Sequence, residues 1–311
     1  MSDIPQTHQA PLTTGTADGA ARERGILLAN PRSGAADDDG EEIRAAAADA
    51  GLEVVDLVPS LDLRAFIESR IESGTKLFVV AGGDGSIHAA AQGLVNREAD
   101  LAVVPMGSLN HFARDLGLPL EWREALAVAL AGKTRAIDVG RINGRYFLNN
   151  VLIGVYARIS EYRERYRGSM GKWRAYAKSI RMALRHFHHV SLALEASGRK
   201  VRIRTQLFTV SVGMDDLSRL GLLAPRTDLA AGALHVYWLP RLSRGAFALA
   251  IARYILGVSE TFGDFESIGT DRLSLDFSRP QLRVAVDGEL SRLSAPVEIE
   301  VIPSGLRVRV P

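Results

Sequence analysis

The sequence of 311 residues contains no cysteine. Disulfide frameworks, thiolate nucleophiles and thiolate metal sites are therefore excluded, and the composition fits a reducing compartment. No apolar run approaches the roughly 18 uninterrupted residues of a membrane-spanning helix, since the best candidate, residues 245–258, is short and contains an arginine. The N-terminus lacks the basic-then-apolar pattern of a secretory signal, and we expect residues 1–24 to form a disordered tail.

Charge of one sign is not in excess either. The 38 Lys and Arg residues and the 36 Asp and Glu residues give a formal net charge of +2. This balance predicts no nucleic-acid partner, because such partners select strongly basic surfaces. We expect a cytoplasmic protein of one or two globular domains, which would meet a membrane only as a peripheral protein.

The first half of the chain alternates between strand-like and helix-like segments. Each short apolar run is followed by a segment with helical character, which predicts a parallel sheet covered by helices on both faces. The predicted strands span residues 25–30, 52–58, 76–81 and 101–105, and the predicted helices span residues 41–50, 63–73, 87–96 and 123–131.

The second half is dominated by β-rich runs with turn signals between them. Asn143-Gly144 predicts a hairpin, and residues 190–212 predict another. Two helical stretches, residues 158–189 and 243–257, interrupt the pattern. We therefore expect an α/β domain over residues 25–140 and a mainly antiparallel β-sandwich over residues 141–311, whose last strand can return to the first domain. The remaining predicted strands lie in residues 234–240, 272–277, 282–290, 297–302 and 306–310.

A glycine-rich loop, Gly-Gly-Asp-Gly-Ser at residues 82–86, lies where a predicted strand meets a predicted helix. Ligands of open α/β sheets bind at the carboxyl ends of strands, glycine allows close approach, and a helix N-terminus favours phosphate. Asp84 needs a metal ion, a donor hydroxyl or a backbone amide, because its charge repels phosphate. An ordinary strand-to-helix turn capped by Asp84 is the alternative on this stretch alone.

Two further loops occupy equivalent positions after predicted strands. Residues 30–34 read NPRSG, and residues 105–117 read PMGSLNHFARDLG. We expect the three loops to share one edge of the sheet.

These loops, followed downstream by VDGE at residues 286–289, resemble the diacylglycerol kinase catalytic domain family in order and spacing. That family includes bacterial lipid kinases and sphingosine kinases, and it shares its fold with NAD kinases. The resemblance runs from about residue 25 to the C-terminus. It implies a Rossmann-like, NAD kinase-type nucleotide-binding domain and a lipid-substrate domain. It also implies an ATP- and Mg²⁺-dependent lipid kinase, which phosphorylates the hydroxyl of a diacylglycerol-like or sphingoid-like lipid in the cleft between the domains.

The resemblance carries the family's nucleotide contacts onto the three loops and onto one serine after the second strand. Because no Walker lysine is present, Mg²⁺ and cations such as Arg32 would neutralise the phosphates. The implied ATP-binding residues are Asn30, Pro31, Arg32, Ser33, Gly34, Ser60, Gly82, Gly83, Asp84, Gly85, Ser86, Ile87, His88, Ser108 and Asn110.

The family's catalytic carboxylate falls on Glu289, which would remove the proton of the acceptor hydroxyl. Asp287 would support it, and Asp84 would engage Mg²⁺ or the acceptor. From the residues alone, Asp287-Gly288 is equally a common hairpin turn, and the two roles are compatible. Asn149 and Asn150 match the family segment that begins the second domain.

A structural magnesium site is the point at which the sequence departs from the family. Acids are expected just before Gly232, but Ala230 and Ala231 stand there, and only Asp228 remains nearby. Because Mg²⁺ prefers oxygen ligands, the site would depend on Asp228 and backbone carbonyls.

Residues 160–190 are rich in arginine and lysine with interleaved aromatic residues. Such a helix favours the surface of an anionic membrane, and a solvated helix packed on the second domain is the alternative. His186, His188 and His189 have no acidic neighbour that would indicate a metal site.

Two other functions remain open from the sequence. One is an NAD kinase-like enzyme on the same fold, although the GSLN loop favours a lipid kinase. The other is a non-catalytic nucleotide or lipid sensor, favoured only by the missing acids. Exposed sheet edges are compatible with a homodimer.

Overall fold

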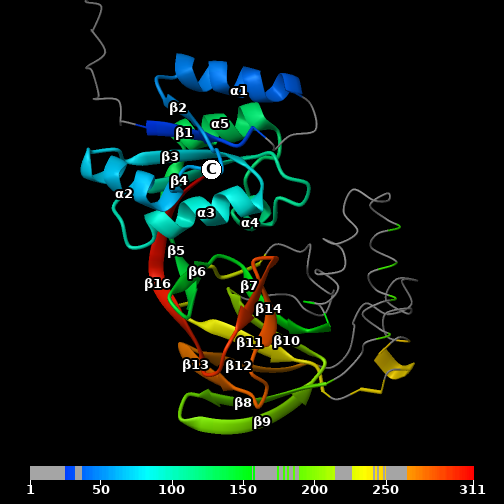
Figure 1. Ribbon diagram of the computed structural model, residues 1–311. Coiled ribbons are helices and arrows are strands. Elements are labelled where there is room, and N and C mark those ends of the chain that lie inside the picture. Colours follow the sequence, from blue (N-terminus) through cyan, green and yellow to red (C-terminus); the bar gives the residue numbers. More distant parts are fainter. Residues whose placement is uncertain are drawn as a thin grey trace, which may run out of the picture.

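The computed structural model describes two lobes joined along one side (Figure 1). The described residues are 25–31, 37–155, 157, 174, 178, 181, 185, 189–213, 226–240, 242–243, 245–247, 249 and 265–311. The predicted tail, residues 1–24, therefore lies outside them. No helix among these residues has the length and apolar character needed to cross a membrane.

The first lobe is a parallel sheet between two layers of helices, as the alternating pattern predicted. Its strands follow the order β2-β1-β3-β4, and all neighbouring pairs are parallel. The strands are β1 (Gly25–Ala29), β2 (Glu53–Asp56), β3 (Leu77–Gly82) and β4 (Asp100–Pro105). The helices are α1 (Asp37–Asp49), α2 (Leu63–Glu72), α3 (Asp84–Leu94), α4 (His111–Asp115) and α5 (Trp122–Ala131).

The side chains of each central strand alternate between two cores, because successive residues of a strand face opposite sides of the sheet. Val79 and Ala81 face α1 and α5. Phe78 and Val80 face α2, α3 and α4. Both sides of β3 and β4 are completely buried, which explains why these strands are continuous apolar runs rather than alternating ones.

The second lobe is an antiparallel sandwich, and its core fills the space between two sheets. One sheet has the order β12-β11-β10-β7-β14-β15, and the other continues the first lobe's sheet as β16-β13-β8-β9. Strands from the first half of this lobe are β5 (Lys133–Ile142), β6 (Arg145–Phe147), β7 (Asn150–Gly154), β8 (Val190–Ala196), β9 (Arg199–Thr205) and β10 (Leu207–Val212). The later strands are β11 (Leu234–Trp238), β12 (Glu266–Thr270), β13 (Arg272–Asp276), β14 (Leu282–Val286), β15 (Glu289–Leu293) and β16 (Val297–Val310).

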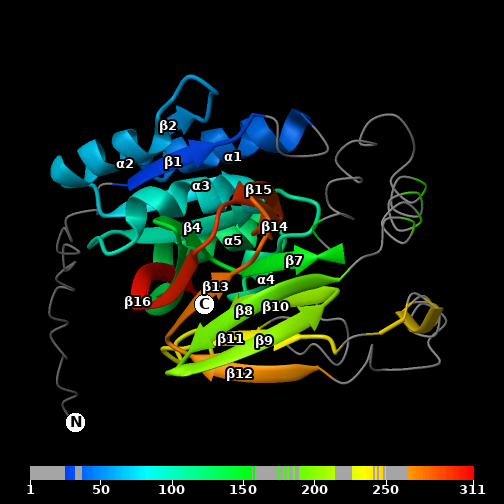
Figure 2. The same cartoon turned by 60° about the horizontal axis from the view of Figure 1, so that its bottom comes forward.

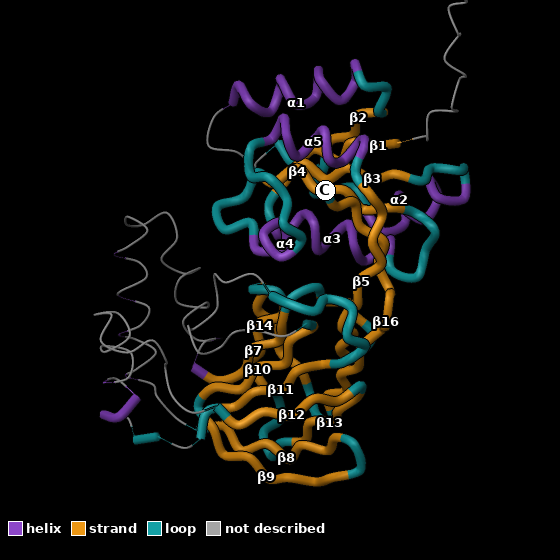
Figure 3. The backbone as a smooth tube through the Cα atoms, turned by 180° about the vertical axis from the view of Figure 1, so that it is seen from behind, coloured by secondary structure: helices purple, strands orange, loops and turns teal. Residues whose placement is uncertain are grey.

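Strand β16 connects the two lobes. Its first half pairs with β13 in the sandwich, and its end pairs in parallel with β4 in the first lobe. Strand β5 accompanies it along most of its length, with a shift of register between Ile302 and Leu306 (Figure 3). The sequence pattern predicted separate strands over residues 297–302 and 306–310, whereas Pro303, Ser304 and Gly305 form a bulge within one strand.

Candidate active site

The loops that follow β1 and β3 are joined by a side-chain hydrogen bond. Asn30 Nδ2 donates to Ser86 Oγ at 2.8 Å. Gly82 makes this contact possible, because a Cβ atom there would lie 2.8 Å from Ser86 Cβ and 3.6 Å from Asn30 Cβ. Only Gly83 separates the end of β3 from the start of α3, so the turn is tighter than the sequence predicted.

The loop that follows β4 packs directly on the glycine loop. A Cβ atom on Gly107 would lie 2.8 Å from Gly83 Cα, so the two backbones are in contact. Asp84 continues this contact, since its carboxylate accepts hydrogen bonds from the amides of His111 at 3.2 Å and Phe112 at 3.1 Å. Loops from three strand ends therefore converge at one edge of the parallel sheet.

The surface at the start of α3 is suited to the binding of an anion. Gly83, the N-cap residue of α3, provides no side chain to accept the helix's first amides. Open space surrounds the Cβ position of Gly85 in the first turn, with no heavy atom within 4 Å. A helix start without a side-chain cap presents amide donors and the positive end of the helix dipole, which favour phosphate.

Asp287 and Gly288 form the turn between β14 and β15, and Asp287 contacts His88 of α3. The hairpin and α3 lie close together in Figure 2. Both turn residues have left-handed backbones, with φ of +47° and +83°, as a two-residue hairpin turn requires. The Asp287 carboxylate accepts hydrogen bonds from the amides of Leu148, Asn149 and Asn150 at 2.7, 2.8 and 3.0 Å.

Glu289 directly follows this turn as the first residue of β15. Its side chain is 53 % exposed, and Oε2 lies 3.4 Å from Arg145 Nη2. This weak, exposed ion pair leaves the carboxylate accessible. The residue lies at the hairpin tip that packs on α3, the helix that begins at the glycine loop.

A buried ion pair fastens the second lobe to the segment after the β4 loop. Arg226 and Asp115 lie 2.8 Å apart between Nη2 and Oδ2, with side chains only 4 % and 6 % exposed. The Arg226 guanidinium also donates to the carbonyl oxygens of Leu148, Asn149 and Val212. No local pattern predicted this pair, because its members are 111 positions apart in the sequence.

The remaining predicted nucleotide residues fall into separate groups. Arg32, Ser33 and Gly34 lie outside the described residues. Pro31, Ser60 and Ser108 are exposed on loops after β1, β2 and β4.

Three other predicted residues turn their side chains inward. Asn110 is 8 % exposed and accepts a hydrogen bond from the Gly107 amide at 2.8 Å. Ile87 is completely buried in the core beneath α3. His88 is turned toward Asp287. Because the side chains of Ile87 and His88 point inward, only their backbone atoms could contact a nucleotide at the loop surface.

The loop that was expected to hold a structural magnesium ion is fastened without a carboxylate cluster. Asp228 is exposed, and within the described ranges no group of three or more His, Asp or Glu side chains could hold a metal ion. Instead, the buried Asp138 carboxylate accepts the amides of Gly232 and Ser304. The described residues therefore supply no cluster of acidic side chains for the family's structural magnesium site, and a site built from Asp228 and backbone carbonyls stays a prediction.

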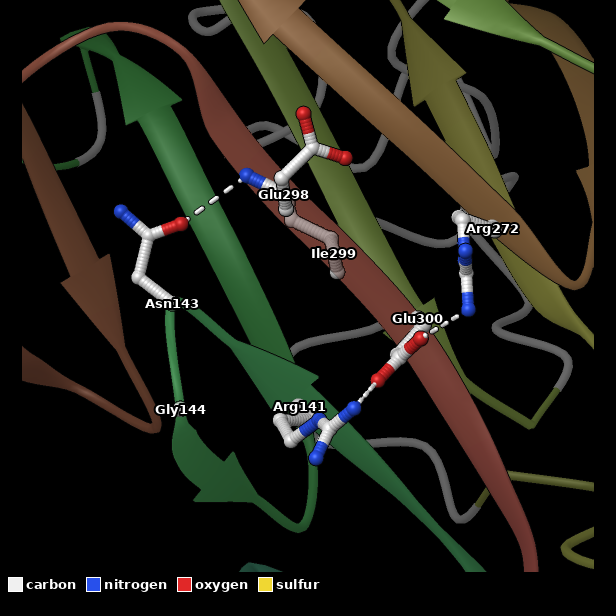
Figure 4. A pocket seen from close by; sticks show the side chains of 7 residues that line it. All are labelled: Arg141, Asn143, Gly144, Arg272, Glu298, Ile299 and Glu300. Atoms are coloured by element: carbon white, nitrogen blue, oxygen red, sulfur yellow. Dashed lines mark hydrogen bonds and ion pairs between the residues drawn. The ribbon is translucent and has the colours of Figure 1, made fainter.

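A pocket of about 290 Å³ lies on the strands that join the lobes, lined by residues of β5, β13 and β16 and of the turn after β5 (Figure 4). Three of its four charged side chains pair with one another, since Glu300 bonds both Arg141 and Arg272. The fourth, Glu298, accepts a hydrogen bond from Ser274. None of the predicted site residues lines it, and we do not assign the function to it.

Comparison with protein families gives two matches, which together cover most of the chain. Residues 24–142 match the diacylglycerol kinase catalytic domain, and residues 149–310 match the YegS C-terminal NAD kinase beta sandwich-like domain. The chain belongs to the diacylglycerol kinase family. This membership explains why the glycine loop and the Asp-Gly-Glu hairpin, distant in sequence, occur together.

Individual relatives of this lipid kinase family support the assignment. A Pseudomonas aeruginosa protein named "Probable lipid kinase YegS-like" is 39 % identical over 128 residues, which cover 39 % of this chain and 42 % of that protein. The diacylglycerol kinase of Bacillus subtilis is 27 % identical over 219 residues, which cover 68 % of this chain and 71 % of the relative. The match to the first of these relatives thus spans less than half of its length.

A solved structure establishes the likeness of the whole fold. The crystal structure of a diacylglycerol kinase from Bacillus anthracis aligns with a TM-score of 0.68 at 19 % identity. The alignment covers 93 % of this chain and 97 % of that one. Both lobes, and the crossing strand between them, therefore belong to the shared fold.

Proposed function

We propose that the protein is an ATP-dependent kinase that phosphorylates the hydroxyl group of a lipid at the junction of its two lobes. One observation carries the proposal: three strand-end loops meet at the start of α3, and the hairpin that presents Glu289 is hydrogen-bonded to the same helix. Phosphoryl transfer depends mainly on alignment and electrostatic stabilisation. The loops at the start of α3 would hold the phosphates on one side, and the hairpin would present Glu289 on the other.

The nucleotide phosphates would bind at the glycine loop, where the amides at the start of α3 and the open space beside Gly85 receive them. Asn30 and Ser86 fix the neighbouring loop surfaces. Magnesium that arrives with ATP would reduce the charge of the phosphates. Asp84 is the carboxylate at this point, and its oxygens, which accept the α4 amides, have further lone pairs for an ion or a hydroxyl.

Glu289 would accept the proton of the lipid hydroxyl as the phosphoryl group is transferred. Its exposure suits a residue that must reach a substrate. The lipid class would be diacylglycerol-like or sphingoid-like, with an apolar tail beside the hydroxyl.

A lipid substrate requires contact with a membrane surface, and four basic residues of the described chain bear on this contact. Arg174, Lys178, Arg181 and Arg185 are each helical, and three of these four side chains are exposed. Their spacing of three and four residues is the spacing of one helical face. We propose that this face meets anionic lipids, as a peripheral contact on the cytoplasmic side.

A lipid-extract screen with isotopically labelled ATP and Mg²⁺ tests the proposed function. We expect a labelled phospholipid in the products, identified by mass spectrometry, and a loss of labelling in Glu289→Gln. NAD in place of the lipid is the control for the related reaction on this fold. Labelling of NAD alone, or of nothing while ATP still binds, would overturn the lipid kinase assignment.

A further inference from the structure

Helix α3 contacts the second lobe through two side chains that lie one helical turn apart. His88 Nδ1 is 2.6 Å from Asp287 Oδ2, and these two side chains are only 5 % and 3 % exposed. Gln92 Nε2 lies 3.2 Å from His88 Nε2. The hydrogen bond between His88 and Asp287 therefore links α3 to the hairpin tip in the interior of the molecule.

The backbone of Tyr146 determines which nitrogen of His88 carries the proton. Gln92 Oε1 accepts the Tyr146 amide at 3.1 Å, and Gln92 Nε2 donates to the Tyr146 carbonyl at 2.9 Å. This pair of bonds fixes the orientation of the amide, so the second hydrogen of Nε2 faces His88 Nε2 at 3.2 Å and the His88 carbonyl oxygen at 3.4 Å. We assign the shorter contact to a hydrogen bond that His88 Nε2 accepts, so Nδ1 donates to Asp287.

The Asp287 carboxylate has no free capacity for a ligand. Oδ2 accepts from His88 and from the Leu148 amide, and Oδ1 accepts from the amides of Asn149 and Asn150. Its function must therefore be to hold the hairpin. Only Gly288 separates it from Glu289, and only three residues separate Asp84 from His88.

We infer that His88 is a positioning residue, which acts through Asp287 to fix Glu289 relative to the glycine loop and does not bind the nucleotide with its side chain. The inference rests on the proposed function for its kinetic consequence. The buried hydrogen bond between His88 and Asp287 directly links the helix of the glycine loop to the hairpin of Glu289. A misplacement of about 1 Å at such a site costs about 100-fold in rate.

Two isosteric substitutions separate this role from nucleotide binding. In His88→Asn, the side-chain amide occupies the place of Nδ1 and can still donate to Asp287. In His88→Gln, the amide reaches the place of Nε2 and leaves Asp287 without this donor. We expect His88→Gln to lower kcat about 10- to 100-fold, with the KM for ATP changed less than about threefold, and His88→Asn to restore most of kcat. Equal kcat values for both variants, or a raised KM for ATP at unchanged kcat, would overturn the inference.

Hydrogen exchange provides a readout that needs no substrate. The amides of residues 148–150 donate to Asp287, so their exchange, followed by mass spectrometry, should be faster in His88→Gln and near wild-type in His88→Asn. If His88→Gln does not fold, Gln92→Met, which removes the orienting amide, should produce the same change more weakly. Unchanged exchange in His88→Gln, or in Gln92→Met where His88→Gln does not fold, refutes the inference. If the wild-type protein has no lipid kinase activity but the variants show the expected exchange, the proposed function is refuted and the positioning role of His88 is not.

Discussion

Replacement of Arg226 by methionine should destabilise the protein strongly, because it leaves the Asp115 carboxylate buried without a counter-charge. The pair lies 2.8 Å apart, with both side chains more than nine-tenths buried. Removing one partner of such a pair costs about 3–5 kcal/mol. The substitution also leaves the carbonyl oxygens of Leu148 and Val212 without their donor, so we expect the upper end of this range.

Urea unfolding followed by circular dichroism measures this loss. A stability of about 5–15 kcal/mol is usual for a folded domain, so Arg226→Met should shift the midpoint markedly or unfold the protein. The double variant Asp115→Asn/Arg226→Met, which removes both charges, should be more stable than the sum of the single effects predicts, by about 2 kcal/mol or more. Arg226→Lys retains the charge but not the planar donor fork, and it should be intermediate.

A small effect would refute this reasoning. If Arg226→Met lowers the free energy of unfolding by less than about 1 kcal/mol, or if the single effects add without coupling, the pair does not hold the lobes together in the way that its burial indicates.

Three further predictions concern the loops. Gly107→Ala should destabilise by about 1–3 kcal/mol and weaken ATP binding in calorimetry, because the new Cβ would lie 2.8 Å from Gly83 Cα; wild-type affinity would contradict the packing. Asp84→Asn should abolish phosphoryl transfer in the labelled-ATP assay and cost about 1 kcal/mol in urea unfolding, since one of its two α4 hydrogen bonds loses its acceptor. Excess EDTA should stop phosphoryl transfer but leave the unfolding midpoint unchanged, because Asp138 and Arg226 hold the 226–232 segment without a metal; a lower midpoint would indicate a structural ion.

The strands and longer helices of the first lobe were predictable, because the residues that favour each of them lie within the element itself. The continuous apolar runs at Leu77–Gly82 and Asp100–Pro105 indicated buried parallel strands, and the rule for open sheets then brought their loops to one edge. Helix α4 was missed because its five residues are too few for a period to show. Strand β12, Glu266–Thr270, was missed because its sequence ESIGT has little β character.

The contacts that organise the candidate site could not be predicted from local pattern. His88 and Asp287 are 199 residues apart, and Arg226 and Asp115 are 111 residues apart. Each of these residues has an ordinary local explanation, such as a helical position or a turn. Only the tertiary fold shows that they are partners. The family resemblance supplied Glu289 and Asp287, but it did not supply His88 as the partner of Asp287.

The path of β16 has a consequence for biosynthesis. This strand pairs with β4 and β5, yet it follows the whole sandwich in chain order. While a ribosome is still translating the second lobe, the first lobe has its helices but lacks a sheet neighbour, and β4 presents an open edge. Completion of the first lobe's sheet must therefore wait for β16, and nascent chains should depend on chaperone protection of the β4 edge until this strand arrives.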